Sequence, residues 1–152
     1  MHSLVEELSL LLSGKNLRLA TAESCTGGMI AAAMTDRAGS SAIFERGYVT
    51  YSNESKIEEL GVKSETIESY GAVSAQAAIE MAQGALKNSH ADIALSVTGI
   101  AGPTGGTPEK PVGLVYIGIA QPNKDPEAIK NIFDGDRASI RQATMEKALE
   151  LL

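Results

Sequence analysis

Residues 17–34 constrain the fold most, because the sequence changes its pattern abruptly within them. An apolar, strand-like run over 17–22 leads through Gly27 and Gly28 directly into a helix-like run of small residues over 29–34. A helix N-terminus carries unpaired backbone N–H groups and the positive end of the helix dipole, which can hold a developing negative charge. Ser24 lies in this turn, and its hydroxyl is therefore a candidate nucleophile.

Strand-like and helix-like segments alternate along the rest of the chain. Ser3 and Glu6 predict a capping box that starts a helix ending at Gly14, while Ser74 and Asp136 predict caps of two later helices. A short helix is expected over 53–60. Further strands are expected over 44–51, 93–97, 112–120 and 129–133. This alternation predicts an α/β protein with a layered sheet.

The size and charge of the chain limit the classes of function. Its 152 residues fit a single domain over 1–152, and the net charge of −6 opposes general attraction to nucleic acid or to anionic membranes. A cytoplasmic protein is favoured by three features of the sequence. The lone Cys25 cannot form an internal disulfide, the N-terminus has no apolar signal core, and no run of roughly 20 apolar residues could form a membrane helix. His2 and His90 with one cysteine make no zinc cluster of familiar spacing. The sequence therefore gives no motif for a metal site, although a metal bound by carboxylates stays open.

Ser24 needs a proton acceptor, and the sequence offers few. His2 lies in the terminus and His90 in a turn before a strand, so a Ser-His-Asp triad is poorly supported. The Gly-x-Ser-x-Gly and Ser-x-x-Lys motifs are both absent. Lys56 follows the second predicted strand and could project from the same sheet edge as Ser24. At an unperturbed pKa of about 10.4, only roughly one lysine in 2,500 is neutral at pH 7, so Lys56 would need desolvation or a neighbouring cation.

Simpler structural roles for these residues remain open at this point. Ser24 could be a helix N-cap, and Lys56 a solvated lysine on a helix rich in charge. Cys25, near the same helix N-terminus, is either a second candidate nucleophile or a small buried side chain.

Two further segments could bind an anion. The glycine-rich stretch over 98–107 follows a predicted central strand, and its backbone N–H groups could turn toward a phosphate or an oxyanion, although a long turn explains it equally well. Arg137 and Arg141 lie one helical turn apart. Together they could clamp a phosphate or carboxylate, or they could pair with the many acidic side chains of the chain.

In combination these segments resemble the CinA C-terminal domain family, whose members include nicotinamide-mononucleotide amidohydrolases. The resemblance spans nearly the whole chain, in order, and longer members carry an additional N-terminal domain, so that the chain is similar to the stand-alone form. The matching motifs are residues 22–28, 48–53 with Lys56, 71–74, 98–106, 110–113, and 135–137 with Arg141.

The resemblance implies a three-layer α/β/α sandwich around a mostly parallel or mixed sheet. It implies an amidase that converts nicotinamide mononucleotide to nicotinate mononucleotide and ammonia, without a cofactor, often as a homodimer. Ser24 would be the nucleophile and Lys56 the base. The residues expected around the substrate are Cys25, Thr26, Gly27, Ser41, Tyr48, Thr98, Gly99, Gly102, Thr104, Gly105 and Arg141.

Two alternative functions compete with the amidase. A non-catalytic nucleotide-binding or regulatory domain would use the glycine-rich stretch and Arg141 to hold a phosphate, with Ser24 as a plain cap. A metal-dependent hydrolase would draw on Asp36, Asp134 or Asp136, for which the spacing follows no recognised motif.

Overall fold

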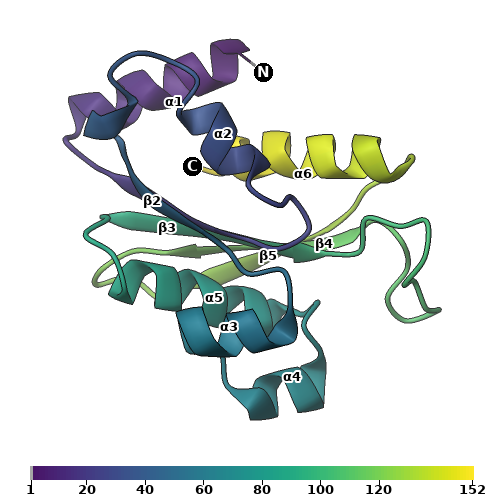
Figure 1. Cartoon of the computed structure of the whole chain (residues 1–152). Coiled ribbons are helices and arrows are strands. Elements are labelled where there is room, and N and C mark those ends of the chain that lie inside the picture. The colour runs from purple at the N-terminus through teal and green to yellow at the C-terminus, as the bar shows by residue number, and fades with distance from the viewer. Residues whose placement is uncertain (1) are drawn as a thin grey trace.

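The protein is built on a five-stranded mixed sheet with helices on both faces (Figure 1). We describe residues 2–152 in a computed structural model. The strands lie in the order β2-β1-β3-β4-β5, in which β2, β1 and β3 are parallel and β4 is antiparallel to both of its neighbours, β3 and β5. Their bounds are β1 (Leu19–Glu23), β2 (Phe44–Val49), β3 (Ile93–Gly99), β4 (Leu114–Ala120) and β5 (Glu127–Ile132). This architecture confirms the predicted α/β sandwich with a mixed sheet.

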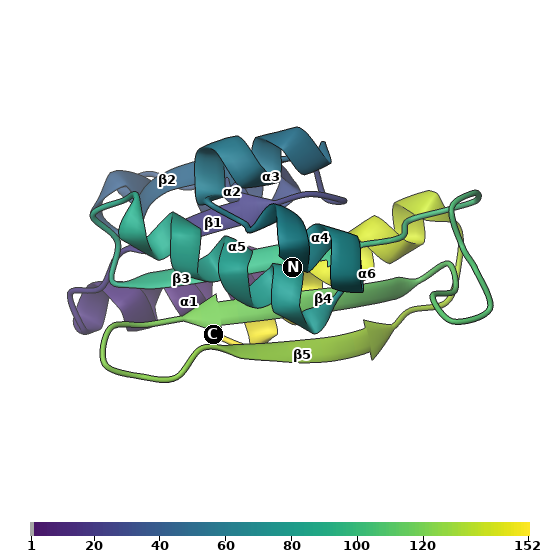
Figure 2. The same ribbon diagram turned by 90° about the horizontal axis from the view of Figure 1, so that it is seen from below.

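Three helices lie on each side of the sheet, as the two views show (Figures 1 and 2). On one side lie α1 (His2–Gly14), α2 (Met29–Met34) and α6 (Arg137–Glu150), and on the other lie α3 (Asn53–Leu60), α4 (Ser64–Tyr70) and α5 (Ala75–Lys87), with α4 packed outside α5. A single 3₁₀ turn, η1 (Ser40–Ala42), precedes β2.

The two faces of the sheet are packed differently. Large aliphatic side chains such as Leu19, Leu95 and Ile117 fill the layer beneath α1, α2 and α6. Beneath α5 the sheet presents small residues, and a Cβ added to Gly118 would lie 2.5 Å from the Ala78 carbonyl oxygen. Because no side chain fits there, α5 rests directly on the sheet, and Ser96 Oγ donates a hydrogen bond of 2.6 Å to the same carbonyl.

Most predicted elements are confirmed, and the errors lie mainly at their ends. Helices α2 and α3 have the predicted bounds, and the caps at Ser74 and Asp136 accept hydrogen bonds from Ala77 N–H at 3.1 Å and Ser139 N–H at 2.9 Å. The capping box at Ser3 is wrong, because α1 already begins at His2 and Ser3 lies inside its first turn. Helix α4 was not predicted.

The sheet topology brings two distant segments together. β1 and β2 are parallel, and their last residues, Glu23 and Val49, are paired. The turn after β1 and the start of α3 after β2 therefore emerge at the same edge of the sheet. Ser24 lies in the first of these segments and Lys56 in the second.

Candidate active site

Ser24 and Lys56 are in direct contact. Lys56 Nζ lies 3.0 Å from Ser24 Oγ. The Ser24 N–H donates to the Val97 carbonyl at 3.1 Å, which extends the pairing of β1 and β3 by one residue and fixes the serine backbone. Ser52 caps α3 by accepting the Ser55 N–H, and this cap sets the direction in which the first turns of α3 carry Lys56.

Lys56 is buried, which rules out its interpretation as a solvated surface lysine. Its side chain is 1% exposed, and its amine also donates to the carbonyls of Thr50 at 3.0 Å and Tyr51 at 3.2 Å. Among the described residues no carboxylate lies within ion-pair distance of this amine. Burial therefore lowers the pKa of Lys56 from its ordinary value, because desolvation disfavours the ammonium form.

The N-terminus of α2 does not face Ser24 as predicted, and Ser24 is not its cap. The N-cap position is Gly28, which has no side chain to cap the helix, and the acceptor for its first N–H groups comes from Glu23. The Glu23 carboxylate accepts the N–H groups of Ile30 at 2.9 Å and Ala31 at 3.0 Å. These N–H groups of the helix are thus already occupied. Because side chains alternate along a strand, Glu23 points toward α2 and Ser24 points to the opposite face of the sheet.

Two other backbone amides remain available next to the serine. The Gly27 N–H donates to the Ser24 carbonyl at 3.1 Å and is occupied. In the part of the chain that the structure describes, the N–H groups of Cys25 and Thr26 have no backbone acceptor, and the Cys25 N–H contacts only the sulfur of its own residue, which is a weak acceptor. A tetrahedral oxyanion on Ser24 would therefore meet donors from the turn itself and not from the helix.

Cys25 is the only cysteine of the chain, and its thiol is buried. Burial raises its pKa to about 11, although the Cys25 backbone hydrogen bond partly opposes this shift. A thiol with this pKa is almost entirely protonated at neutral pH, so the environment favours its interpretation as a small buried side chain.

The two arginines of α6 bind backbone groups around the site. Arg141 donates through Nε to the Cys25 carbonyl at 3.0 Å and through Nη2 to the Thr26 carbonyl at 3.1 Å. Arg137 bridges the Gly102 carbonyl at 2.7 Å and the Tyr51 hydroxyl at 3.0 Å. Their contacts lie on different backbone segments, and within residues 2–152 neither arginine forms an ion pair with an acidic side chain.

The glycine-rich segment forms a loop between β3 and β4 that extends past the end of the sheet (Figure 1). Thr98 is buried at the end of β3, and its hydroxyl donates to the Ala72 carbonyl at 2.8 Å. Gly99 lies so close to β4 that a Cβ atom on it would be 2.5 Å from Val115 Cγ2. Gly102 has a φ of 77°, and its carbonyl faces Arg137. Thr104 and Gly105 are exposed in the loop.

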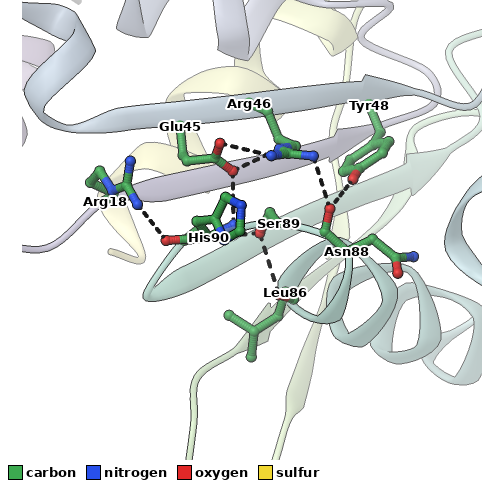
Figure 3. A network of polar contacts seen from close by, with 9 residues as sticks. Arg18, Glu45, Arg46, Tyr48, Leu86, Asn88, Ser89 and His90 are labelled. Carbon is green, nitrogen blue, oxygen red and sulfur yellow. Dashed lines mark hydrogen bonds and ion pairs between the residues drawn. The ribbon is translucent and has the colours of Figure 1, made fainter.

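Tyr48, Ser41 and His90 are not brought to Ser24. The Tyr48 hydroxyl donates to the Asn88 carbonyl at 2.6 Å, just after the C-terminus of α5, in a polar network that includes His90, whose N–H donates to Glu45 at 3.0 Å (Figure 3). His90 precedes β3 and Ser41 precedes β2, whereas Ser24 follows β1. In parallel strands these positions belong to opposite sheet edges, so the structure contains no Ser24–His90 pair.

Several residues at the site were not singled out from the sequence. Thr50 and Tyr51 supply the carbonyls that bind the amine, and their membership of the motif over 48–53 was the only signal for them. Glu23 lies next to the serine, but nothing in the sequence shows to which groups its carboxylate binds.

Asp36, Asp134 and Asp136 do not assemble into a metal site. Within residues 2–152 we find no group of three His, Cys, Asp or Glu side chains that could hold a metal ion. Asp136 instead caps α6. The same residues include no helix with the length and apolar character needed to cross a membrane.

The site therefore defines a protein of the α/β/α sandwich class in which a serine hydroxyl contacts a buried amine, an arrangement that could serve nucleophilic catalysis. The chain belongs to the CinA C-terminal domain family, whose profile matches residues 1–152.

Relatives and solved structures agree with this assignment. The chain is 52% identical over 151 residues to a putative competence-damage inducible protein of Caldicellulosiruptor saccharolyticus and 57% identical over 143 residues to a CinA-like protein of Endomicrobium trichonymphae. The alignments include 99% and 94% of this chain, but only 36% and 33% of the two relatives. The chain therefore spans about a third of the length of the curated relatives it matches.

Two crystal structures share the fold over nearly the whole chain. The competence/damage inducible protein CihA from Agrobacterium tumefaciens superposes with a TM-score of 0.95 at 47% identity, covering 99% of this chain and 92% of that one. A CinA superfamily protein from Escherichia coli superposes with a TM-score of 0.94 at 34% identity, covering 98% and 86%.

Proposed function

We propose that the protein is an amidohydrolase that converts nicotinamide mononucleotide to nicotinate mononucleotide and ammonia through an acyl-enzyme on Ser24. The observation that carries the proposal is the 3.0 Å contact between Ser24 Oγ and the buried amine of Lys56. The choice of substrate rests on the resemblance of the motifs around these residues to those of nicotinamide-mononucleotide amidohydrolases.

The surroundings of Lys56 suit a neutral amine acting as a base. A neutral amine has two N–H donors and one lone pair, and the carbonyls of Thr50 and Tyr51 accept two hydrogen bonds. Since a carbonyl can only accept, these contacts direct the two N–H groups away from Ser24. The lone pair is left facing the Ser24 hydroxyl, which can then donate its proton to Nζ.

The chemical steps follow from this geometry. Ser24 Oγ attacks the carboxamide carbon while its proton passes to Lys56, and the negative charge on the amide oxygen is received by the N–H groups of Cys25 and Thr26. One such donor is worth about 3 to 4 kcal/mol in a well-studied protease. Lys56 then returns the proton to the leaving nitrogen, and ammonia departs. Water attacks the resulting ester while Lys56 takes one of its protons, and Lys56 then gives this proton to the leaving Ser24 Oγ, which restores the serine hydroxyl and the neutral amine. The acid product ionises to the carboxylate in solvent and is released.

We extend the proposal to the working form of the protein. A single catalytic domain over residues 1–152 acts without a cofactor, as a cytoplasmic homodimer. The dimer rests on the family resemblance, and light scattering on the purified protein tests it.

An ammonia assay tests the proposed reaction. Wild-type protein with nicotinamide mononucleotide should release ammonia in amounts equal to the nicotinate mononucleotide formed, and Ser24→Ala should release none while its circular dichroism spectrum is unchanged. Saturable binding without ammonia release would favour the regulatory domain. Activity abolished by exhaustive chelation would favour the metal-dependent hydrolase, and full activity of Ser24→Ala would contradict the Ser–Lys mechanism.

A further inference from the structure

The buried Glu23 carboxylate has no role in the steps above. Its side chain is 1% exposed, and no basic group lies within ion-pair distance among the described residues. A buried charge without a counter-ion is costly unless hydrogen bonds compensate it. Here three donors do so, and the positive end of the α2 dipole adds to them.

The three donors come from the turn that carries the serine and from the helix that follows it. Thr26 Oγ1 donates to Glu23 at 2.6 Å from the middle of the turn, and the N–H groups of Ile30 and Ala31 donate at 2.9 and 3.0 Å from the start of α2. The last residue of β1 is thereby tied to the turn and to the helix that follows it. Gly27 and Gly28, with φ values of 60° and 108°, allow the chain to close in this way.

This closure determines where the free amides point. The Thr26 side chain is held on the Glu23 side, and among the described residues the Cys25 and Thr26 N–H groups next to Ser24 have no backbone acceptor. Glu23 itself cannot serve as the base for Ser24, because it lies on the other face of β1 and its oxygens already accept three hydrogen bonds.

We infer that Glu23 is a positioning residue, which holds the turn over 24–28 so that the Cys25 and Thr26 amides and the Ser24 hydroxyl are aligned for the transition state. This inference rests on the proposed amidase function. It assigns the carboxylate no contact with substrate and no proton transfer.

The variant Glu23→Gln tests the alignment. The glutamine side chain has one accepting oxygen and one NH₂ group, whereas the carboxylate has two accepting oxygens. In either orientation of the side-chain amide, the NH₂ group faces the N–H of Ile30 or of Ala31, and that hydrogen bond is lost. We expect kcat for ammonia release to fall about 10- to 100-fold with KM nearly unchanged, because small displacements of reacting groups cost this much.

Glu80→Gln is the matched control. The Glu80 carboxylate accepts the Lys63 N–H at 2.8 Å and Thr66 Oγ1 at 2.7 Å, so it makes the same kind of contacts at the start of α4. This variant should lower the melting temperature without changing kcat. An equal loss of kcat in both variants would overturn the inference, since it would show a general effect on stability.

The pH profile separates positioning from an electrostatic effect on Lys56. The kcat/KM profile of Glu23→Gln should run parallel to that of wild type, lower at every pH. A displaced midpoint would overturn the inference, because Glu23 would then act through the charge of the amine.

A second variant covers the case in which Glu23→Gln does not fold. Thr26→Val removes one of the three hydrogen bonds and leaves the carboxylate bound to α2. We expect a several-fold loss of kcat, and an unchanged kcat would overturn the inference. These outcomes are distinct from failure of the proposed function, in which wild type releases no ammonia or Ser24→Ala remains active.

Discussion

Arg141 donates hydrogen bonds to two successive backbone carbonyls, from Nε to that of Cys25 at 3.0 Å and from Nη2 to that of Thr26 at 3.1 Å. The peptide bond is planar, so fixing a carbonyl also fixes the direction of the N–H in the same peptide unit. The unit that begins with the Cys25 carbonyl contains the Thr26 N–H. Arg141 therefore orients one of the two amides that the proposed mechanism uses.

Replacing Arg141 by lysine should lower kcat more than it raises KM. A lysine has one compact ammonium and cannot bind both carbonyls with the planar geometry of a guanidinium, so the Thr26 amide would be less well aligned. We expect a loss of about tenfold in kcat, because imperfect placement of an oxyanion donor costs less than its removal.

Steady-state kinetics on Arg141→Lys measures this change, with Arg18→Lys as its control. Arg18 also donates to a backbone carbonyl, that of His90 at 2.9 Å, at the opposite edge of the sheet. The control should keep wild-type kinetics. A raised KM with unchanged kcat in Arg141→Lys would instead support direct binding of the substrate by this arginine.

The fold could be predicted because it depends on local pattern. The same pattern put Ser24 and Lys56 at one sheet edge but left simpler roles open for both, and the prediction that they act as a pair came from the family resemblance. Runs of apolar residues place Ser24 and Lys56 after neighbouring strands, and parallel strands bring such positions to one edge. The burial of Lys56 could not be predicted, since it depends on how α3 packs. Helix α4 was missed because its Ser64–Tyr70 sequence has no clear apolar face.

The partners of charged side chains were the hardest feature to predict. Arg141 was expected to bind either a substrate anion or an acidic side chain, and it binds carbonyls more than a hundred residues earlier in the chain. Glu23 faces away from the serine beside it, and only the start of α2 reveals why. Such contacts depend on tertiary packing and leave no periodic signal in the sequence.

Activity should rise with pH as Lys56 loses its proton. Only the neutral amine can act as the base, and burial lowers the Lys56 pKa from 10.5, so the rise in kcat/KM should be centred below that value. A pH–rate profile measures the midpoint. Lys87→Met, which changes an exposed lysine at the end of α5, should leave the profile unchanged, and a profile that falls with rising pH would contradict the assignment of the base.

The same pKa shift predicts how stability depends on pH. Between the lowered pKa of folded Lys56 and its ordinary value of 10.5, the unfolded chain binds more protons, so the free energy of unfolding of wild type rises with pH in that interval. Lys56→Met lacks this contribution. The stability of the variant relative to wild type, measured by urea unfolding, should therefore decline as pH increases toward 10.5.

Cys25 should be unreactive toward thiol reagents in the folded protein. Burial raises its pKa to about 11, so roughly one thiol in ten thousand is ionised at pH 7. Iodoacetamide at pH 7 should leave the ammonia-releasing activity intact, and thiol titration should detect the cysteine only after unfolding. Rapid inactivation of wild type, together with an active Ser24→Ala, would instead identify Cys25 as the nucleophile.

Thr21→Val should stabilise the protein. Thr21 is fully buried in β1, and its hydroxyl has no hydrogen-bond partner in the described structure. Valine has nearly the same shape and suits a strand, so the substitution removes an unpaired polar group without creating a cavity. We expect the free energy of unfolding to rise by about 1 kcal/mol and the melting temperature by about 2 to 4 °C.

Thr98→Val is the matched control, because that hydroxyl donates to the Ala72 carbonyl at 2.8 Å, and its loss should lower stability instead. A decrease in both variants would show that the Thr21 hydroxyl has a partner in solution.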